Sequence, residues 1–184
     1  LPSTSGMMLL FNSKNGILEA VLLDQGYLTN VRTAVAGAIA SKYLAKKNIT
    51  NVGIIGAGAQ ARLQLDALML VKKPKELRIW SRNENQVNKY ISKINKSYDL
   101  KAISCKNAQE VTENSEILIT TTPSKEPLIK QDWLHPGMQI TAMGSDAENK
   151  NEIDPKIITK SDLYVCDRQT QTSILGELNH AIKK

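Results

Sequence analysis

Three short segments of the sequence place polar or charged side chains directly after an apolar, β-branched run. They are Ser81-Arg82, Thr120-Thr121-Thr122 and Gly144-Ser145-Asp146. A carboxylate in a cleft can accept or donate a proton during a reaction, and an arginine can bind a phosphate through parallel hydrogen bonds. These side chains act together if the runs before them are neighbouring strands of a parallel sheet, because ligands bind where such strands end. Asp146 can equally cap a helix or lie on a surface loop.

A glycine-rich turn supplies the ligand that such an edge could hold. Residues 51–61 read NVGIIGAGAQA, a short buried strand followed by a turn and then a helix over 62–71. Gly56 permits the tight turn, Gly58 lets backbone approach a pyrophosphate, and Ala61 is small enough for the helix to pack on the strand. The helix N-terminus then faces the phosphates. This pattern predicts a bound dinucleotide, although a glycine-rich turn in another α/β protein would look similar.

The residues after the second strand bear on the choice of dinucleotide. A carboxylate there would bind the adenosine ribose of NAD, whereas this chain has a hydroxyl in Ser81 and a cation in Arg82. The pair suits a 2′-phosphate and favours NADP(H), unless Arg82 only covers the adenine or lies in solvent. Thr120, Thr121 and Thr122 could line the middle of the dinucleotide, although Thr120 could equally be there because threonine suits a buried strand.

The order of apolar runs predicts an α/β fold, a Rossmann-type doubly wound parallel sheet with right-handed crossovers. From Thr50 onward, strands alternate with helices or connecting segments. The expected strands are 52–55, 77–80, 100–104, 116–122, 138–143 and 162–166, and the expected helices are 62–71, 85–95, 107–114 and a short one that begins at Asp154-Pro155.

Residues 1–48 do not follow this alternation. Apolar runs at 7–11 and 17–23 flank Asn12-Ser13-Lys14-Asn15-Gly16, which predicts a hairpin. A helix is expected from Thr29, a good N-cap, to Lys47. Arg32, one turn into it, could bind a substrate carboxylate or a cofactor phosphate, or could face solvent. We expect 1–48 to be part of a second domain, because a hairpin and one helix cannot bury both their faces alone, and 49–170 to be the dinucleotide-binding domain.

Composition excludes some classes of function. The net charge of +6 comes from scattered lysines without interleaved aromatic residues, so nucleic-acid binding is not expected. No apolar run approaches the ~20 residues that span a bilayer, and we expect a cytoplasmic protein without membrane contact. His135 and His180 lack ligand-like partners, so no metal site is expected. Because the chain begins at Leu1 and stops at Lys184, we interpret it as an internal piece of a longer protein.

Six motifs together carry a family resemblance. They are LPSTSGMM, YLTNVRTAVAG, VGIIGAGAQARLQLDAL, ITTTPS, LHPGMQITAMGSDAENKNEI and CDRQTQTSILGEL. The chain resembles the ornithine cyclodeaminase/mu-crystallin family over essentially its whole length, and is most similar to bacterial cyclodeaminase-like members, including those associated with ectoine utilization. The resemblance implies NAD(P) as cofactor, a homodimer, and a small amino-acid or cyclic-imine substrate. It also implies that 1–48 are part of an α+β substrate and dimerisation domain built from both chain ends, and that 171–184 are the start of a C-terminal return segment.

The resemblance also implies roles for single residues. Asp146 matches the acid/base aspartate, and Arg32 matches an arginine that touches cofactor phosphate and substrate carboxylate. The other implied cofactor contacts are Ser3, Ala59 and Gln60, the loop Met143-Gly144-Ser145 beside the nicotinamide, and Lys150.

Two of these positions favour different activities. Ser81 replaces the ribose-binding aspartate of NAD-using cyclodeaminases, as in NADPH-using ketimine reductases, whereas those reductases lack the carboxylate found here at Asp146. Because a proton-transfer group bears directly on the reaction, we expect an NAD(P)-dependent cyclodeaminase acting on L-ornithine or a similar diamino acid. The alternatives are an NADPH-dependent ketimine or imino-acid reductase, an amino-acid dehydrogenase, and a non-catalytic binder like mu-crystallin.

Overall fold

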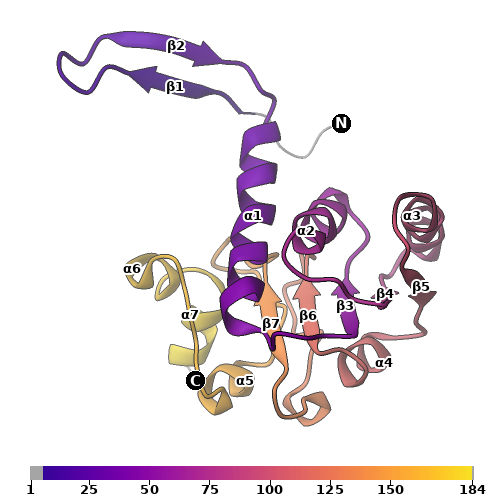
Figure 1. The fold of residues 1–184 in the computed structure, drawn as a ribbon. Coiled ribbons are helices and arrows are strands. Elements are labelled where there is room, and N and C mark those ends of the chain that lie inside the picture. Colours follow the sequence, from indigo (N-terminus) through magenta and orange to yellow (C-terminus); the bar gives the residue numbers. More distant parts are fainter. Residues whose placement is uncertain (1–5, 184) are drawn as a thin grey trace.

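A computed structural model describes residues 6–183 and contains a five-stranded parallel sheet (Figure 1). Its order is β5-β4-β3-β6-β7, so the chain starts in the middle, moves to one side and then returns to build the other. This is the doubly wound topology that the sequence predicts, and the fold class is confirmed. The strands are β3 (Asn51–Ile55), β4 (Glu76–Trp80), β5 (Lys101–Ser104), β6 (Ile117–Thr120) and β7 (Gln139–Ala142).

Helices cover both faces of the sheet because successive strand residues point to opposite sides. Val52 and Ile54 of β3 pack on one face with α2 (Ala59–Met69) and α3 (Glu84–Ser97). Ile55 packs on the other face with α4 (Ala108–Glu113) and α5 (Pro155–Lys160). A single 3-10 turn, η1 (Gln131–Trp133), leads to β7, and α6 (Gln169–Thr172) and α7 (Gly176–Ile182) follow α5.

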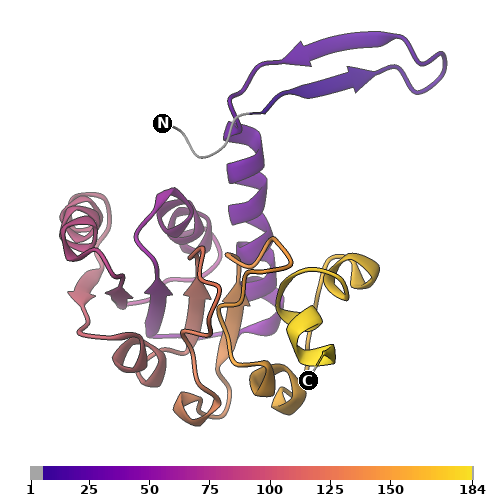
Figure 2. The same cartoon turned by 180° about the vertical axis from the view of Figure 1, so that it is seen from behind.

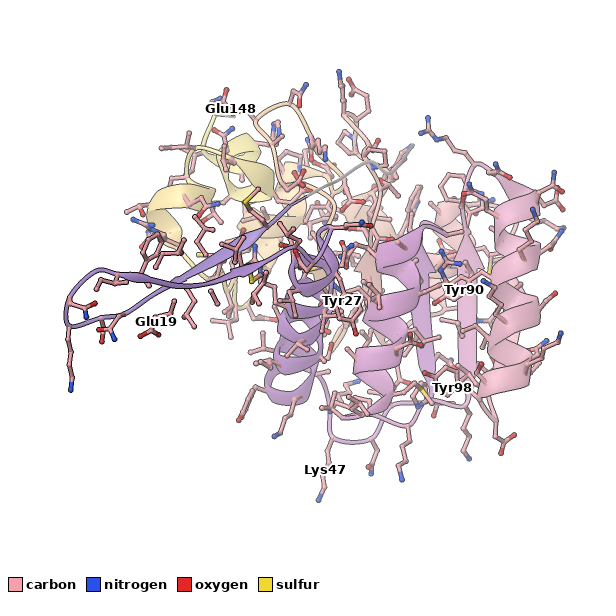
Figure 3. The ribbon with its side chains drawn as sticks, turned by 90° about the horizontal axis from the view of Figure 1, so that it is seen from above. Glu19, Tyr27, Lys47, Tyr90, Tyr98 and Glu148 are labelled. Carbon is pink, nitrogen blue, oxygen red and sulfur yellow. The ribbon has the colours of Figure 1, made fainter. Side chains whose placement is uncertain are left out.

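The N-terminal segment forms an antiparallel hairpin of β1 (Met8–Phe11) and β2 (Leu18–Leu22), followed by α1 (Tyr27–Leu44). The hairpin projects from the body at the start of α1, and Glu19 lies far out on it (Figures 2 and 3). Both of its faces leave apolar side chains exposed, Leu9 at 50% and Leu10 at 55% among them. The hairpin is therefore present as predicted, and residues 6–183 leave much of it uncovered.

Helix α1 begins at Tyr27, so the prediction that Thr29 caps it is wrong. The carboxylate of Asp24 does this instead, because its Oδ2 accepts a hydrogen bond from Leu28 N at 2.7 Å and its Oδ1 one from Gly26 N at 3.3 Å. The helix packs on α2 through the small buried residues Ala34, Gly37 and Ala38, and Ser41 Oγ donates to Gln139 Oε1 of β7 at 3.1 Å. A Cβ at Gly37 would lie 2.1 Å from Gln64 Oε1, so a larger residue there would have to displace the side chain of Gln64.

The strand predicted over 162–166 is wrong, since these residues pair with no strand in the described part of the chain. Leu163 and Val165 are 66% and 57% exposed there. Strand formation depends on a neighbouring strand and a half-buried surface more than on residue type, and this segment, which runs from α5 to α6, has neither. Helix α2 also begins at Ala59, three residues before the prediction, directly after Gly58.

Candidate active site at the carboxyl edge of the sheet

The strand register brings the predicted segments to one edge. Ile55 is paired with Trp80 of β4 and with Thr120 of β6, and Thr120 is paired with Ala142 of β7. The next residue in each case stays on the ladder: Gly56 N donates to Trp80 O at 2.9 Å and Thr121 N to Ile55 O at 2.9 Å. The loops at 56–58, 81–83, 121–123 and 143–146 therefore leave the sheet side by side.

Glycine is required at position 56 by the protein itself. Gly56 has a φ of +115°, and a Cβ there would lie 2.5 Å from Thr121 Oγ1 and 2.9 Å from Thr121 O. At Gly58 the situation is different, because a Cβ would meet nothing within 4 Å. Gly58 immediately precedes α2, whose first turn offers free backbone N–H groups. The open space at a helix N-terminus fits the phosphates of a dinucleotide.

A cleft of about 530 Å³ lies next to Gly58, between α2 and α3. Arg62 of α2 and Lys89 and Lys93 of α3 line it and give it positive charge. Tyr90, which Figure 3 shows between the two helices, donates a hydrogen bond to Ala61 O at 2.8 Å. Burial raises the pKa of Tyr90, so this tyrosine stays neutral and the cleft keeps its net positive charge.

The loop after β4 is shaped by its own side chains. Ser81 Oγ accepts a hydrogen bond from Asn83 N at 3.1 Å, and Asn83 caps α3 by accepting one from Gln86 N at 3.2 Å. Arg82 between them is exposed. The hydroxyl proton of Ser81 and the guanidinium of Arg82 can thus both donate to an anion that lies along this loop.

Helix α1 brings Arg32 close to the start of α2. Gln60 Nε2 donates to Asn30 Oδ1 at 3.1 Å and to Asn30 O at 3.3 Å, and Gln64 Nε2 donates to Thr33 O at 3.1 Å. These bonds hold the turn that carries the exposed Arg32 against the first turns of α2. The side chain of Gln60 thus joins two helices, a role that the family resemblance alone did not indicate.

The loop after β7 presents a carboxylate and an ammonium together. Lys150 Nζ lies 2.5 Å from Asp146 Oδ1, and Asp146 is the more exposed partner, with side-chain exposures of 73% and 28%. Ser145 Oγ donates to Lys150 O at 2.6 Å, which closes the loop on itself. Met143 packs against the core. Asp146 is therefore exposed enough to contact a ligand at this edge of the sheet while its carboxylate is paired with the ammonium of Lys150.

Sequence reasoning missed a buried carboxylate behind these loops, that of Glu152. Its Oε1 accepts hydrogen bonds from Thr122 N at 2.6 Å and Thr122 Oγ1 at 2.7 Å, and its Oε2 from Thr120 Oγ1 and Gly144 N, both at 2.7 Å. Burial raises the pKa of Glu152 against the opposing effect of these bonds. The hydroxyl of Thr122 points at this carboxylate, and that of Thr121 at Ile55 O, 3.3 Å away.

Helix α7 supports the same loop from behind. Glu177 Oε1 accepts a hydrogen bond from Glu152 N at 2.7 Å, and His180 Nε2 bonds Lys150 O at 2.8 Å. Burial raises the pKa of Glu177 to about 7, and the nearby charge of Glu152 adds to the effect. The segment that carries Asp146 is therefore fixed by residues 25 and 30 positions further along the chain than the residues they bond.

The raised pKa of Glu177 predicts a pH dependence of stability. Between the ordinary value of 4.5 and about 7 the folded chain binds a proton that the unfolded chain has lost, so its stability falls as pH rises through this window. The shift corresponds to roughly 3 kcal/mol in the free energy of unfolding. Thermal unfolding at pH 5 and pH 8 should show a smaller difference for Glu177→Gln than for the wild type; equal differences would contradict the assignment.

Ser3 lies outside the described residues. Among residues 6–183, no group of three or more histidine, cysteine, aspartate or glutamate side chains is arranged to hold a metal ion. No helix within the same range is long and apolar enough to cross a bilayer.

Comparisons with known proteins point in one direction. The family model described as Ornithine cyclodeaminase/mu-crystallin family matches residues 1–184. An uncharacterized cyclodeaminase of Sinorhizobium fredii is 45% identical over 183 residues, covering 100% of this chain and 55% of that protein.

Two solved structures show the same arrangement. An archaeal alanine dehydrogenase dimer with bound NAD superposes with a TM-score of 0.92 at 35% identity, over 100% of this chain and 56% of that one. The Δ1-pyrroline-2-carboxylate reductase of Thermococcus litoralis, in complex with NADH and L-proline, also gives 0.92, at 32% identity and with the same coverage of 100% and 56%. The chain thus spans about half the length of the relatives it matches. It belongs to the ornithine cyclodeaminase/mu-crystallin family.

Proposed function

We propose that the protein binds NAD(P) along the carboxyl edge of the sheet, with the pyrophosphate at the N-terminus of α2. The open space at Gly58 and the positively charged cleft beside it support this placement, as do the solved relatives that hold NAD or NADH. Residues that would hold the cofactor are Arg32, Gly56, Gly58, Ala59, Gln60, Ser81, Arg82, Thr121, Thr122, Met143, Gly144, Ser145 and Lys150, with Ser3 added by the resemblance.

The proposed reaction is cyclodeamination of L-ornithine or a similar diamino acid. When bound, a nicotinamide supplies a hydride acceptor that later returns the hydride. The substrate carbon that bears the α-amine is oxidised to an imine by loss of that hydride, and the δ-amine adds to it. Ammonia then leaves and the hydride returns to the cyclic imine, so that L-ornithine gives L-proline and ammonia without net oxidation.

The observation that carries this proposal is the Asp146–Lys150 pair in the loop after β7, which leaves the sheet at the same edge as the glycine turn. Each amine step in the reaction moves a proton, and an exposed carboxylate at the strand edge can take it up and release it. Arg32 supplies a guanidinium that can bind the substrate carboxylate or a cofactor phosphate. Together these two residues are the proposed catalytic and orienting groups.

The test uses the full-length protein with L-ornithine and a catalytic amount of NAD or NADP. Release of ammonia without net change in absorbance at the reduced-nicotinamide band is the expected result. Absence of ammonia from L-ornithine and from shorter and longer diamino acids would sink the proposal. Reduction of all the added cofactor, after which turnover stops, would indicate an amino-acid dehydrogenase instead.

A second candidate, an NADPH-dependent imino-acid reductase, is favoured by the hydroxyl at Ser81 in place of a ribose-binding carboxylate. The reductase of Thermococcus litoralis, whose structure contains NADH and L-proline, supports imino-acid reduction on this fold, with NADH rather than NADPH as its cofactor. For this activity, pyrroline-2-carboxylate or its six-membered analogue would consume one NADPH per molecule. A non-catalytic binding role would instead leave every one of these substrates unchanged while the cofactor still binds.

Arg82 is expected to set the preference for NADP(H). Arg82→Ala should weaken NADPH binding by about 10- to 100-fold, the size of a lost charge-assisted hydrogen bond, and leave NADH nearly unchanged. Isothermal titration with both cofactors measures the two affinities. The matched control is Arg168→Ala, an exposed arginine at the start of α6. Equal weakening of NADH and NADPH by Arg82→Ala would show that Arg82 does not read the 2′-phosphate.

The exposed hairpin bears on partners and domains. Leu9, Leu10 and the neighbouring Phe11 at 54% exposure require a cover, which the rest of a longer chain or a second copy can supply. We propose that residues 1–48 belong to a substrate and dimerisation domain, 49–170 to the dinucleotide-binding domain and 171–184 to a return segment, within a homodimer. The relative that crystallised as a dimer with NAD supports this assignment.

A further inference from the structure

Glu152 is a carboxylate that none of the roles above uses. Its side chain is fully buried, at 0% exposure, and it lies behind the loops after β6 and β7 rather than in the positively charged cleft. Resting on the proposed NAD(P) site, we infer that Glu152 is a positioning residue: it ties these two loops together and thereby sets where residues 143–146, Asp146 among them, stand relative to the nicotinamide end of the cofactor.

The backbone hydrogen bonds to the Glu152 carboxylate come from two different loops. Each oxygen of Glu152 receives one backbone N–H, Oε1 that of Thr122 and Oε2 that of Gly144. Backbone N–H groups can only donate, so this bridge needs an acceptor at both ends. A carboxylate offers two acceptor oxygens, whereas the amide of glutamine offers one and turns its NH₂ group toward the other donor. The bridge is therefore specific to a carboxylate of this length.

The loops after β6 and β7 lie very close to each other and to the Glu152 side chain. A Cβ at Gly144 would lie 2.1 Å from Thr122 O and 2.6 Å from Glu152 Cδ. Because β6 and β7 are neighbours in the sheet, the loops leave it together and close on the carboxylate without spare volume. Asp146 follows Gly144 by two residues, so a displacement of Gly144 is passed on to Asp146.

Glu152 is itself held in place by hydrogen bonds to its backbone. Its backbone N–H donates to Glu177 Oε1 of α7, and its carbonyl accepts from Leu128 N at 2.7 Å and Ile129 N at 3.2 Å. An isolated parallel bridge joins Ile129 to Ile153, the next residue. Because the backbone of Glu152 is fixed in this way, its side chain holds the two loops in one position. Catalysis requires such precise placement of a reacting group.

A second carboxylate, that of Glu116 directly before β6, provides a built-in comparison. Glu116 Oε2 also accepts two backbone hydrogen bonds, from Thr50 N at 2.5 Å and Asn51 N at 3.1 Å, but at the opposite, amino edge of the sheet. Loss of Glu116 should therefore affect stability without reaching the site. Comparing variants of Glu116 and Glu152 therefore separates a general contribution to stability from positioning of the loops at the carboxyl edge of the sheet.

The experiment measures binding by the full-length protein of a dinucleotide and of the matching fragment that lacks nicotinamide, ADP-ribose for NADH and its 2′-phosphate for NADPH. We expect Glu152→Gln to weaken the dinucleotide at least 10-fold and to leave the fragment within about twofold of wild type, since the fragment occupies only the glycine turn and the cleft. Glu116→Ala should lower the Tm and change neither affinity. Because Glu152→Gln removes a buried bridge, Thr120→Val serves as a milder variant that deletes one donor to the same carboxylate.

Thr120→Val should weaken the dinucleotide several-fold, again without effect on the fragment. Equal weakening of dinucleotide and fragment by both variants, or no weakening by either, would overturn the inference. If the wild-type protein itself bound neither the dinucleotide nor the fragment, the proposed NAD(P) site would fail instead, so the two failures are distinguishable.

Discussion

Replacing Asp146 by asparagine is expected to lower kcat for cyclodeamination by about 10²- to 10⁴-fold, the usual contribution of a positioned proton-transfer group. Asparagine keeps the size of the side chain and can still accept a hydrogen bond from Lys150, so the loop should keep its shape. It cannot take up a proton from the substrate amine. The affinity for NAD(P) and the Tm should therefore stay close to the wild-type values.

Glu148→Gln is the matched control for this prediction. Glu148 is an exposed carboxylate on the same loop, two residues after Asp146, and it lies at the outside of the molecule in Figure 3. Glu148→Gln should leave kcat within about twofold of the wild-type value, because it removes a charge from the loop but no side chain from the proposed site. If both variants lowered kcat alike, the effect would come from loop charge and the assignment of Asp146 as the acid/base would be wrong.

Gly56→Ala is expected to give the largest loss of stability among single changes at the site. A side chain at a φ of +115° is strained, and its Cβ would collide with the backbone oxygen of Thr121 at 2.9 Å. Strain and overpacking each cost on the order of 1–3 kcal/mol, so the free energy of unfolding should fall by about 3 kcal/mol or more. Urea unfolding of both proteins measures the difference.

The neighbouring glycine gives the opposite expectation and acts as the control. At Gly58 the φ is −83° and the added methyl group meets no protein atom, so Gly58→Ala should leave stability nearly unchanged. The methyl group would instead occupy the space proposed for the pyrophosphate. Dinucleotide affinity should then fall at least 10-fold, about 1.4 kcal/mol or more. Unchanged affinity in Gly58→Ala would place the phosphates elsewhere.

The fold could be predicted largely because its signals are local. The β-branched run of β3, the turn at Gly56 and the small residue at Ala61 are contiguous, and each has a direct physical reason. The same holds for the hairpin, whose turn residues separate two apolar runs. Where the predictions failed, a non-local or neighbouring group decided: Asp24 rather than Thr29 caps α1, and residues 162–166 have no strand beside them among the described residues.

The candidate site was predictable only in part. Residues that directly follow strands, such as Ser81 and Asp146, could be found because parallel strands end at a common edge. Glu152 could not, since its donors at Thr120, Thr122 and Gly144 are 8 to 32 residues away along the chain. Nothing in the local sequence around Glu152 marks it as buried. The bond between Gln60 and Asn30 is hidden for the same reason.

The central claim is that a hydride moves between the substrate α-carbon and a nicotinamide held at this edge. The most direct measurement gives the full-length protein L-ornithine carrying deuterium on the α-carbon, with catalytic NAD(P), and follows the label by mass spectrometry. The account predicts L-proline that retains deuterium on its α-carbon, together with deuterium on the nicotinamide ring when turnover is quenched. Proline formed with its α-deuterium lost to water, and a nicotinamide without label, would contradict it.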